Sequence, residues 1–248
     1  MDYTNKTVLI TGGASGMGLL CGQTYAKDGA NIVLADINAE ALEKCVAEIA
    51  AYPAHVIGVP TDVRDYAQVV HARDMAVQTF GSIDILINCA GGAETRICQA
   101  SGEFPDIPIG VYDFGIDVNL KGPLYFDHAV LAQMRIQKSG VIIHLGSITG
   151  EEGCAGNVAY AASKSALMTG MTKSIARYGA QYNVRCVCVA PGPVLTRPAM
   201  ARMKTMVGRA AEPSEIVDLI QYLTSDRAAF ITGTTYMIDG GRSAMGHA

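Results

Sequence analysis

Seven short apolar runs of strand length recur along the chain, separated by longer stretches with helical spacing of apolar residues. The runs cover residues 7–11, 31–36, 55–60, 83–88, 140–146, 184–190 and 234–239. They are nearly continuous in Val, Ile, Leu and Ala, which is typical of strands buried on both faces of a parallel sheet. Helical candidates lie between them, for example at 39–51 and 66–80. This alternation predicts an α/β fold with a doubly wound parallel sheet of seven strands and helices on both faces.

Three segments are less regular than the rest, and each follows one of the expected strands. They cover residues 92–111, 148–158 and 193–212. Ligands bind at the carboxyl edge of such sheets, so we expect these segments to form the substrate loops. No linker or shift in composition divides the chain, which predicts a single domain over residues 1–248.

Composition narrows the class of function. Half of the residues are hydrophobic, 17% are charged and the net charge is −4, with no cluster of Lys or Arg. This pattern indicates a large buried core and gives no footprint for nucleic acid or for a membrane surface. No signal peptide or membrane span is evident, and the seven cysteines form no CxxC pair. We therefore expect a cytoplasmic protein with reduced thiols that acts on a small molecule, and no metal site is predicted.

A glycine-rich turn follows the first expected strand and opens a helix. Gly12, Gly16 and Gly18 have the spacing TGxxxGxG, which brings backbone N–H groups close to a pyrophosphate at a helix N-terminus. Asp36 ends the second strand, where a carboxylate either binds the adenine-ribose hydroxyls or caps the next helix. A carboxylate there repels a 2′-phosphate, and the turn holds Ser15 but no Arg or Lys. The balance favours NAD over NADP.

Two further strand ends leave their roles open. Asp62 follows the third strand and either faces the adenine or caps a helix. Asn88 ends the fourth strand, before a turn of small residues, and either forms a wall of the cofactor site or braces the sheet.

The stretch AYAASKSAL carries the candidate chemistry. Tyr160 and Lys164 are four residues apart and project from one face of a helix. A free tyrosine, with a pKa of about 10, is a poor base at neutral pH, but a neighbouring ammonium favours the phenolate. Such a phenol can exchange a proton with a substrate hydroxyl while hydride passes to or from a nicotinamide. Ser147, after the fifth strand, can donate a hydrogen bond to the same oxygen or simply cap a turn.

These motifs, in this order, resemble the short-chain dehydrogenase/reductase family over essentially the whole chain. The quoted motifs are TGxxxGxG (11–18), NCAG (88–91), VNLKG (118–122), LGSITG (145–150), YAASK (160–164), PGPVLT (191–196) and ITGTTYMIDGG (231–241). Cys89 stands where the family usually has a second Asn, which we expect to affect packing more than chemistry.

The resemblance implies a Rossmann-type fold, an NAD(P) cofactor and a homotetramer packed through helices around 112–138 and 158–182. It implies that Asn119, Ser147, Tyr160 and Lys164 are catalytic, with Ser147 orienting the substrate and Lys164 contacting the nicotinamide ribose. Asn119 would help to hold a water. Pro123 has no N–H and therefore cannot donate to the Asn119 carbonyl in the helical pattern, which leaves that carbonyl available for the water. The alternative is a kink that only improves packing. The expected cofactor contacts are Gly12, Ser15, Gly16, Met17, Gly18, Asp36, Ile37, Asp62, Val63, Asn88, Ala90, Gly91, Tyr160, Lys164, Pro191, Gly192, Val194 and Thr196.

The substrate pocket is less defined. Glu151, Glu152 and Cys154 are the candidates for substrate contact because they lie between Ser147 and Tyr160. Segment 193–212 contains methionines at 200, 203 and 206, whose spacing favours one helical face packed on the body over a substrate surface. An arginine of this segment either clamps an anionic group or simply lies on the surface. A short polar lid favours a small polyol, sugar or hydroxy acid.

Three functions remain possible on the sequence. The favoured one is an NAD-dependent alcohol dehydrogenase or ketone reductase. An NADPH-dependent 3-oxoacyl-carrier-protein reductase shares the same motifs, and a non-catalytic NAD-binding sensor shares the fold. The full set of candidate catalytic residues argues against the sensor.

Overall fold

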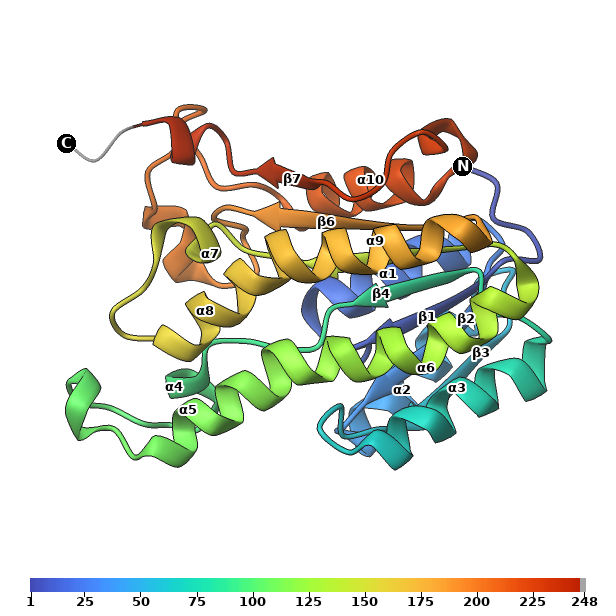
Figure 1. Cartoon of the computed structure of the whole chain (residues 1–248), viewed down its shortest axis with the longest axis horizontal. Coiled ribbons are helices and arrows are strands. Elements are labelled where there is room, and N and C mark those ends of the chain that lie inside the picture. The colour runs from blue at the N-terminus through green and yellow to red at the C-terminus, as the bar shows by residue number, and fades with distance from the viewer. Residues whose placement is uncertain (246–248) are drawn as a thin grey trace.

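The computed structural model describes residues 1–245, and seven parallel strands form one sheet in it, in the order β3-β2-β1-β4-β5-β6-β7 (Figure 1). The strands are β1 (Thr7–Thr11), β2 (Asn31–Asp36), β3 (Val56–Pro60), β4 (Ile85–Asn88), β5 (Gly140–Leu145), β6 (Val184–Pro191) and β7 (Thr235–Ile238). The chain starts in the middle of the sheet, moves to one edge through β3, and returns to build the other half. The predicted seven-stranded, doubly wound parallel sheet is confirmed.

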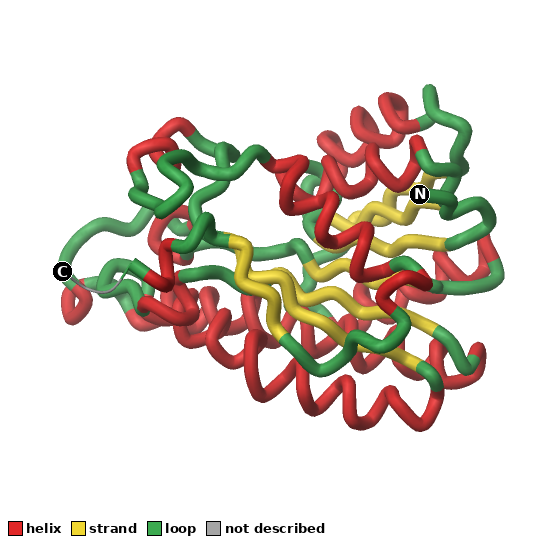
Figure 2. The backbone as a smooth tube through the Cα atoms, turned by 90° about the horizontal axis from the view of Figure 1, so that it is seen from above, coloured by secondary structure: helices red, strands yellow, loops and turns green. Residues whose placement is uncertain are grey.

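Helices flank the sheet on both faces, as the view from above shows (Figure 2). The helices of more than one turn are α1 (Gly16–Lys27), α2 (Ala39–Ile49), α3 (Tyr66–Phe80), α5 (Ile109–Ile116), α6 (Gly122–Gln137), α8 (Val158–Ala166), α9 (Thr172–Gly179) and α10 (Pro213–Thr224). One core contains side chains of α1, α2 and α10, and the other contains side chains of α3, α6 and α9.

Strand β1 shows why the apolar runs are continuous. Val8 and Ile10 point into the first core, whereas Leu9 points into the second, and all three are fully buried. Successive side chains of a strand point to opposite faces, so the middle of a strand covered on both sides favours an apolar residue at every position.

The two expected long helices are each interrupted by a π-helical turn. Asp117–Lys121 lies between α5 and α6, and Leu167–Met171 lies between α8 and α9. In the first, the Gly122 N–H bonds the Asp117 carbonyl, five residues back. Pro123 follows at once, and its missing N–H removes a regular helical bond at this point.

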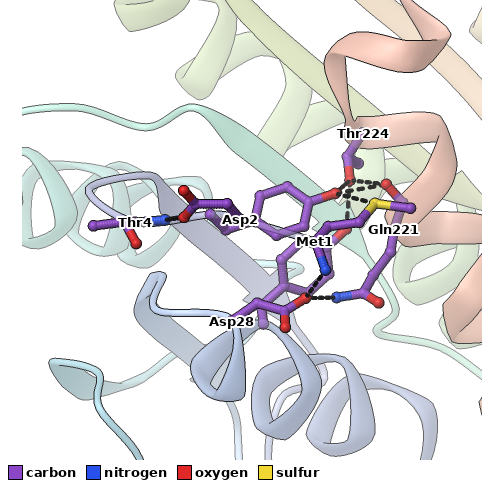
Figure 3. Close-up of polar contacts among 8 residues, drawn as sticks. Met1, Asp2, Thr4, Asp28, Gln221 and Thr224 are labelled. Atoms are coloured by element: carbon purple, nitrogen blue, oxygen red, sulfur yellow. Dashed lines mark hydrogen bonds and ion pairs between the residues drawn. The ribbon is translucent and has the colours of Figure 1, made fainter.

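The N-terminal segment packs against α10, the last long helix of the chain (Figure 3). The Tyr3 hydroxyl donates to the Gln221 carbonyl at 2.6 Å and lies 2.9 Å from the Thr224 hydroxyl. The hydroxyl of Tyr25, from α1, lies 2.6 Å from the same Thr224 oxygen. Burial raises the pKa of both phenols. Residues that are far apart in the sequence thus share one buried polar cluster.

The carboxyl ends of the strands lie on one side of the molecule, where the short helices α4 (Glu94–Ile97) and α7 (Thr149–Glu152) and the start of α8 gather (Figure 1). Each of the three irregular segments follows a strand at this edge. Among residues 1–245, no helix is long and apolar enough to cross a membrane. The same residues contain no group of three or more His, Cys, Asp or Glu side chains arranged to hold a metal ion.

Candidate active site

A cleft of about 820 Å³ runs along the carboxyl edge of the sheet. It receives residues from the ends of six strands and from all three irregular segments. Most of the predicted site residues line it: Gly12, Ser15, Gly16, Met17, Gly18, Asp36, Ile37, Asp62, Val63, Ala90, Gly91, Ser147, Cys154, Tyr160, Pro191, Gly192, Val194 and Thr196. The topology therefore brings residues from Gly12 to Thr196 to one surface.

The glycine turn has the shape that a dinucleotide phosphate group requires. A Cβ on Gly18 would collide with the Gly12 carbonyl oxygen, so this glycine lets the helix start close to the strand. Gly16, at φ +52°, has no atom within 4 Å of the place a Cβ would take, and it lines the cleft. The open space over Gly16, at the N-terminus of α1, fits a pyrophosphate.

Asp36 links the end of β2 to the glycine turn by a hydrogen bond. Its carboxylate accepts hydrogen bonds from the backbone N–H groups of Ala14 and Asn38, both at 3.0 Å. Helix α2 is capped by Asn38, whose side chain accepts from the Ala41 N–H. The alternative in which Asp36 caps this helix is therefore wrong. The carboxylate lines the cleft and keeps acceptor capacity for ribose hydroxyls.

Asp62 lines the cleft, but it is engaged by Arg64, a residue that the sequence reasoning missed. The Arg64 guanidinium donates to both carboxylate oxygens at 2.6–3.1 Å and lies 5.0 Å from the centre of the Phe114 ring. These hydrogen bonds hold the pKa of Asp62 below its usual value. Helix α3 is capped by Asp65, so Asp62 does not cap it.

Tyr160 and Lys164 lie together at the catalytic end of the cleft. The Lys164 ammonium is 5.5 Å from the centre of the Tyr160 ring and donates to the Leu145 carbonyl at 2.7 Å. Lys164 is only 4% exposed. Leu145 ends β5, two residues before Ser147, whose hydroxyl accepts from the Thr149 N–H at 3.1 Å. The end of β5 therefore fixes the serine and the ammonium at once.

Asn119 is fully buried and supports the loop that follows β4. Its amide exchanges hydrogen bonds with Gly92, accepting from the N–H and donating to the carbonyl, both at 2.9 Å. It also donates to the Gly115 carbonyl at 2.9 Å. Its side chain thus shapes the loop that carries Gly91 and Gly92. The proposed role of its own carbonyl in a water relay stays a prediction.

Glu94 is the second residue that the sequence reasoning did not place correctly. It belongs to segment 92–111, which the sequence predicted to form a substrate loop. Instead it is fully buried, and its carboxylate accepts from the N–H groups of Ala159 and Tyr160 at 3.0 and 3.1 Å. Asn157, just before α8, accepts in return from the Thr95 hydroxyl at 2.7 Å. Helices α4 and α8 are therefore joined directly beside the candidate catalytic tyrosine.

Three of the predicted contacts, Asn88, Glu151 and Glu152, lie outside the cleft wall. Asn88 is buried and donates to Asp127 at 3.0 Å, so it braces the sheet behind the cleft. Glu152 forms an ion pair with Arg242, and neither it nor Glu151 belongs to the cleft wall. Of the three substrate candidates, Cys154 alone lines the cleft.

The methionine segment also differs from its favoured interpretation. Met200 and Met203 line the cleft, whereas Met206 is 67% exposed. Only the short 3₁₀-helix Pro198–Arg202 forms here, so the three side chains do not share one buried helical face.

Comparisons with known proteins agree with this geometry. The family model "short chain dehydrogenase" matches residues 6–206. The oxidoreductase UcpA of Salmonella typhimurium is 38% identical, over 96% of this chain and 94% of its own length. The 3-oxoacyl-[acyl-carrier-protein] reductase FabG of Thermotoga maritima is 34% identical, over 97% and 99%.

Among solved structures, an NAD⁺-bound xylitol dehydrogenase superposes with a TM-score of 0.88 at 27% identity, over 97% of this chain and all of that one. The match of family model, full-length relatives and fold leaves one assignment: the chain belongs to the short-chain dehydrogenase family of oxidoreductases.

Proposed function

We propose that this oxidoreductase uses NAD to interconvert a secondary alcohol and a ketone, with a small polyol, sugar or hydroxy acid as substrate. The observation that carries the proposal is the placement of Tyr160 and Ser147 on the cleft wall, with the Lys164 ammonium behind the phenol. A nicotinamide, when bound, accepts the hydride from the alcohol carbon or returns it to the ketone.

The protein residues manage the proton and the geometry. In the oxidation direction Tyr160, as phenolate, takes the proton of the substrate hydroxyl, and in reduction its phenol returns that proton to the oxygen. The Ser147 hydroxyl donates a hydrogen bond to the same oxygen. Lys164, held by the Leu145 carbonyl, places a positive charge beside the phenolate and keeps two N–H groups for other acceptors.

Asp36 supports NAD over NADP. Its carboxylate stands in the cleft at the end of β2, where it repels a 2′-phosphate and accepts from ribose hydroxyls. Arg64, which lines the cleft after β3, is already paired with Asp62. The substitution Asp36→Asn removes the charge and keeps the shape, so it should raise the ratio of NADP to NAD efficiency.

The test is cofactor reduction with a panel of polyols, sugar acids, 3-hydroxyacyl thioesters and hydroxysteroids, with NAD and NADP in parallel. We expect turnover with NAD on a small substrate and a loss of about a hundredfold or more in Tyr160→Phe. Retained turnover in Tyr160→Phe would contradict the proposed proton transfer.

The alternative is an NADPH-dependent 3-oxoacyl-carrier-protein reductase, which the 34% identity to the Thermotoga maritima enzyme favours. Turnover only with NADP and acyl thioesters would select it. A non-catalytic NAD-binding sensor is the second alternative, and binding of NADH without turnover of any panel member would favour it.

We also propose a cytoplasmic homotetramer. Seven free cysteines support a reducing compartment. Large apolar side chains on the outer surface of α6, such as Leu124 and Ile136, support contact with further copies of the chain.

A further inference from the structure

The positive charges beside Tyr160 and Ser147 indicate which kind of substrate the cleft binds. This inference rests on the proposed oxidoreductase function. We propose that the substrate bears an anionic group, a carboxylate or a phosphate, that Arg96 binds with help from Arg197. Both arginines line the cleft together with Tyr160 and Ser147. Arg96 follows β4, and Arg197 follows β6, so they reach the cleft from different loops.

The position of Arg96 is set by its neighbours. It belongs to the single turn of α4, whose Glu94 is fixed to the first N–H groups of α8. The guanidinium lies against Gly92, because a Cβ on that glycine would be 2.6 Å from an Arg96 nitrogen. Gly92 in turn exchanges two hydrogen bonds with the Asn119 side chain. The arginine is thus two contacts away from a candidate catalytic residue.

Gly92 itself supports this placement. Its φ of +157° is rarely adopted by residues with a side chain. A larger residue would also fill the space that the guanidinium occupies. The glycine therefore keeps the Arg96 side chain in the cleft wall.

No negative charge balances these arginines. The acidic residues that line the cleft are Asp36 and Asp62, which follow β2 and β3 on the far side of the sheet. Among residues 1–245, neither Arg96 nor Arg197 takes part in an ion pair.

Two acidic side chains of the loops after β4 and β5 are already engaged. The Glu94 carboxylate faces the α8 backbone, and Glu152 is paired with Arg242.

Lys164 adds a third positive charge, only 3.7 Å from the place a Cβ on Gly91 would take. Guanidinium groups in a cleft bind carboxylates and phosphates through paired, charge-assisted hydrogen bonds. Both arginines are exposed in the cleft, so a neutral polyol or a steroid would leave their charges to the solvent. The geometry therefore selects the acids and phosphates among the small substrates.

The first test compares matched substrates in the wild-type enzyme. Sugar acids and hydroxy acids are paired with their neutral polyols and amides, and sugar phosphates are paired with the free sugars. We expect higher kcat/KM for the charged member. Arg96→Gln should lower kcat/KM for it by about tenfold to a hundredfold, because a hydrogen bond to a charged group contributes about 1.5–3 kcal/mol. The neutral member should change little. The acid and phosphate arms identify which anion is bound.

Arg202→Gln is the matched control, since Arg202 is an exposed arginine of the 3₁₀-helix Pro198–Arg202 and does not line the cleft. It should leave both efficiencies unchanged. Arg96→Lys, which keeps the charge but loses the paired geometry, should restore part of the selectivity.

A second test does not depend on turnover. Malonate, phosphoglycolate and neutral malonamide are titrated into the enzyme with NADH by calorimetry. We expect one of the anions to bind more tightly than malonamide in the wild type and in Arg202→Gln, but not in Arg96→Gln. Equal binding of all three, or anion binding unchanged in Arg96→Gln, would overturn this inference. Tyr160-dependent turnover without a preference for charged substrates would also overturn it, yet leave the proposed function intact.

Discussion

Glu94 is fully buried, yet among residues 1–245 its carboxylate forms no ion pair and is held by two backbone N–H groups of α8. A carboxylate at a helix N-terminus satisfies donors that have no partner within the helix. Here the helix is the one that carries Tyr160, so the orientation of the phenol depends on a residue from another loop.

Substitution of Glu94 should therefore affect turnover more than cofactor binding. In Glu94→Ala both N–H groups lose their acceptor, which should lower kcat by about tenfold or more and the free energy of unfolding by about 1–3 kcal/mol. Glu94→Gln keeps one acceptor and should show a smaller loss. Steady-state kinetics and urea unfolding measure the two effects. A tenfold rise in the KM for NAD with an unchanged kcat would contradict this positioning role.

The cysteine thiols differ from one another in burial. Burial raises the pKa of Cys188 to about 11 and raises that of Cys186 as well, whereas Cys154 is exposed and lines the cleft. A raised pKa keeps a thiol protonated, and therefore unreactive, at every pH below that value.

We therefore expect a thiol reagent at pH 8 to modify Cys154 in the folded protein while Cys186 and Cys188 stay unmodified. Peptide mass spectrometry measures the sites of modification. Bound NADH with a substrate analogue should slow the reaction of Cys154, and the Cys154→Ser variant provides the control. Rapid modification of Cys188 in the native state would contradict the expected protection.

At the scale of elements, a buried polar cluster joins β4, β5, α6 and α9. Asp127 accepts from Asn88 at 3.0 Å and lies 2.7 Å from the Nε2 atom of His144. The Thr172 hydroxyl lies 2.8 Å from Nδ1 of His144 and 2.6 Å from the Leu167 carbonyl, so both ring nitrogens of His144 have a polar partner.

Removal of one member of this cluster should be costly. Asp127→Ala leaves the His144 and Asn88 donors buried without an acceptor, and we expect the free energy of unfolding to fall by about 3–5 kcal/mol. The fully solvated pair Glu40–Lys44 is the control, and Glu40→Ala should change stability little. Urea unfolding compares the two. Equal effects would show that the buried cluster contributes no more than a surface pair.

The sequence predicted these elements better than it predicted their contacts. Strands β1 and β2 and helix α3 have the predicted bounds, because period and composition are local properties. The sequence indicated an irregular helix at Pro123, where the first π-helical turn lies, but the turn at Leu167–Met171 was missed because it resembles a continuous helix in sequence. Glu94 and Arg64 were misplaced or missed because their partners are set by side-chain direction across loops, which no local pattern encodes. Asn88 was left between two roles for the same reason.

At the scale of the whole molecule, apolar side chains remain on the outer surface. Leu124 and Ile136 of α6 are 45% and 74% exposed, and Phe230 is fully exposed. Scattered apolar residues are normal on a surface, but two of these lie on α6, which the family resemblance assigns to the interface between copies.

We expect the wild-type protein to sediment with about four times the chain mass of 26.1 kDa. Leu124→Glu should shift it to a smaller species, because a charge would be buried at the interface. Met206→Glu, at an exposed site of the lid, should not. Sedimentation velocity measures the mass of each species. A wild-type monomer would contradict the proposed tetramer.

The contact between the chain's first segment and α10 also bears on the order in which the protein is made. A ribosome releases β1 and α1 first, but the hydroxyls of Tyr3 and Tyr25 meet the Thr224 oxygen only after α10 has been translated. Until then these hydroxyls face water, and the apolar side chains of α1 that share a core with α10 lack its cover. Nascent chains that end before α10 should therefore remain loosely packed around β1, an interior strand of the finished sheet.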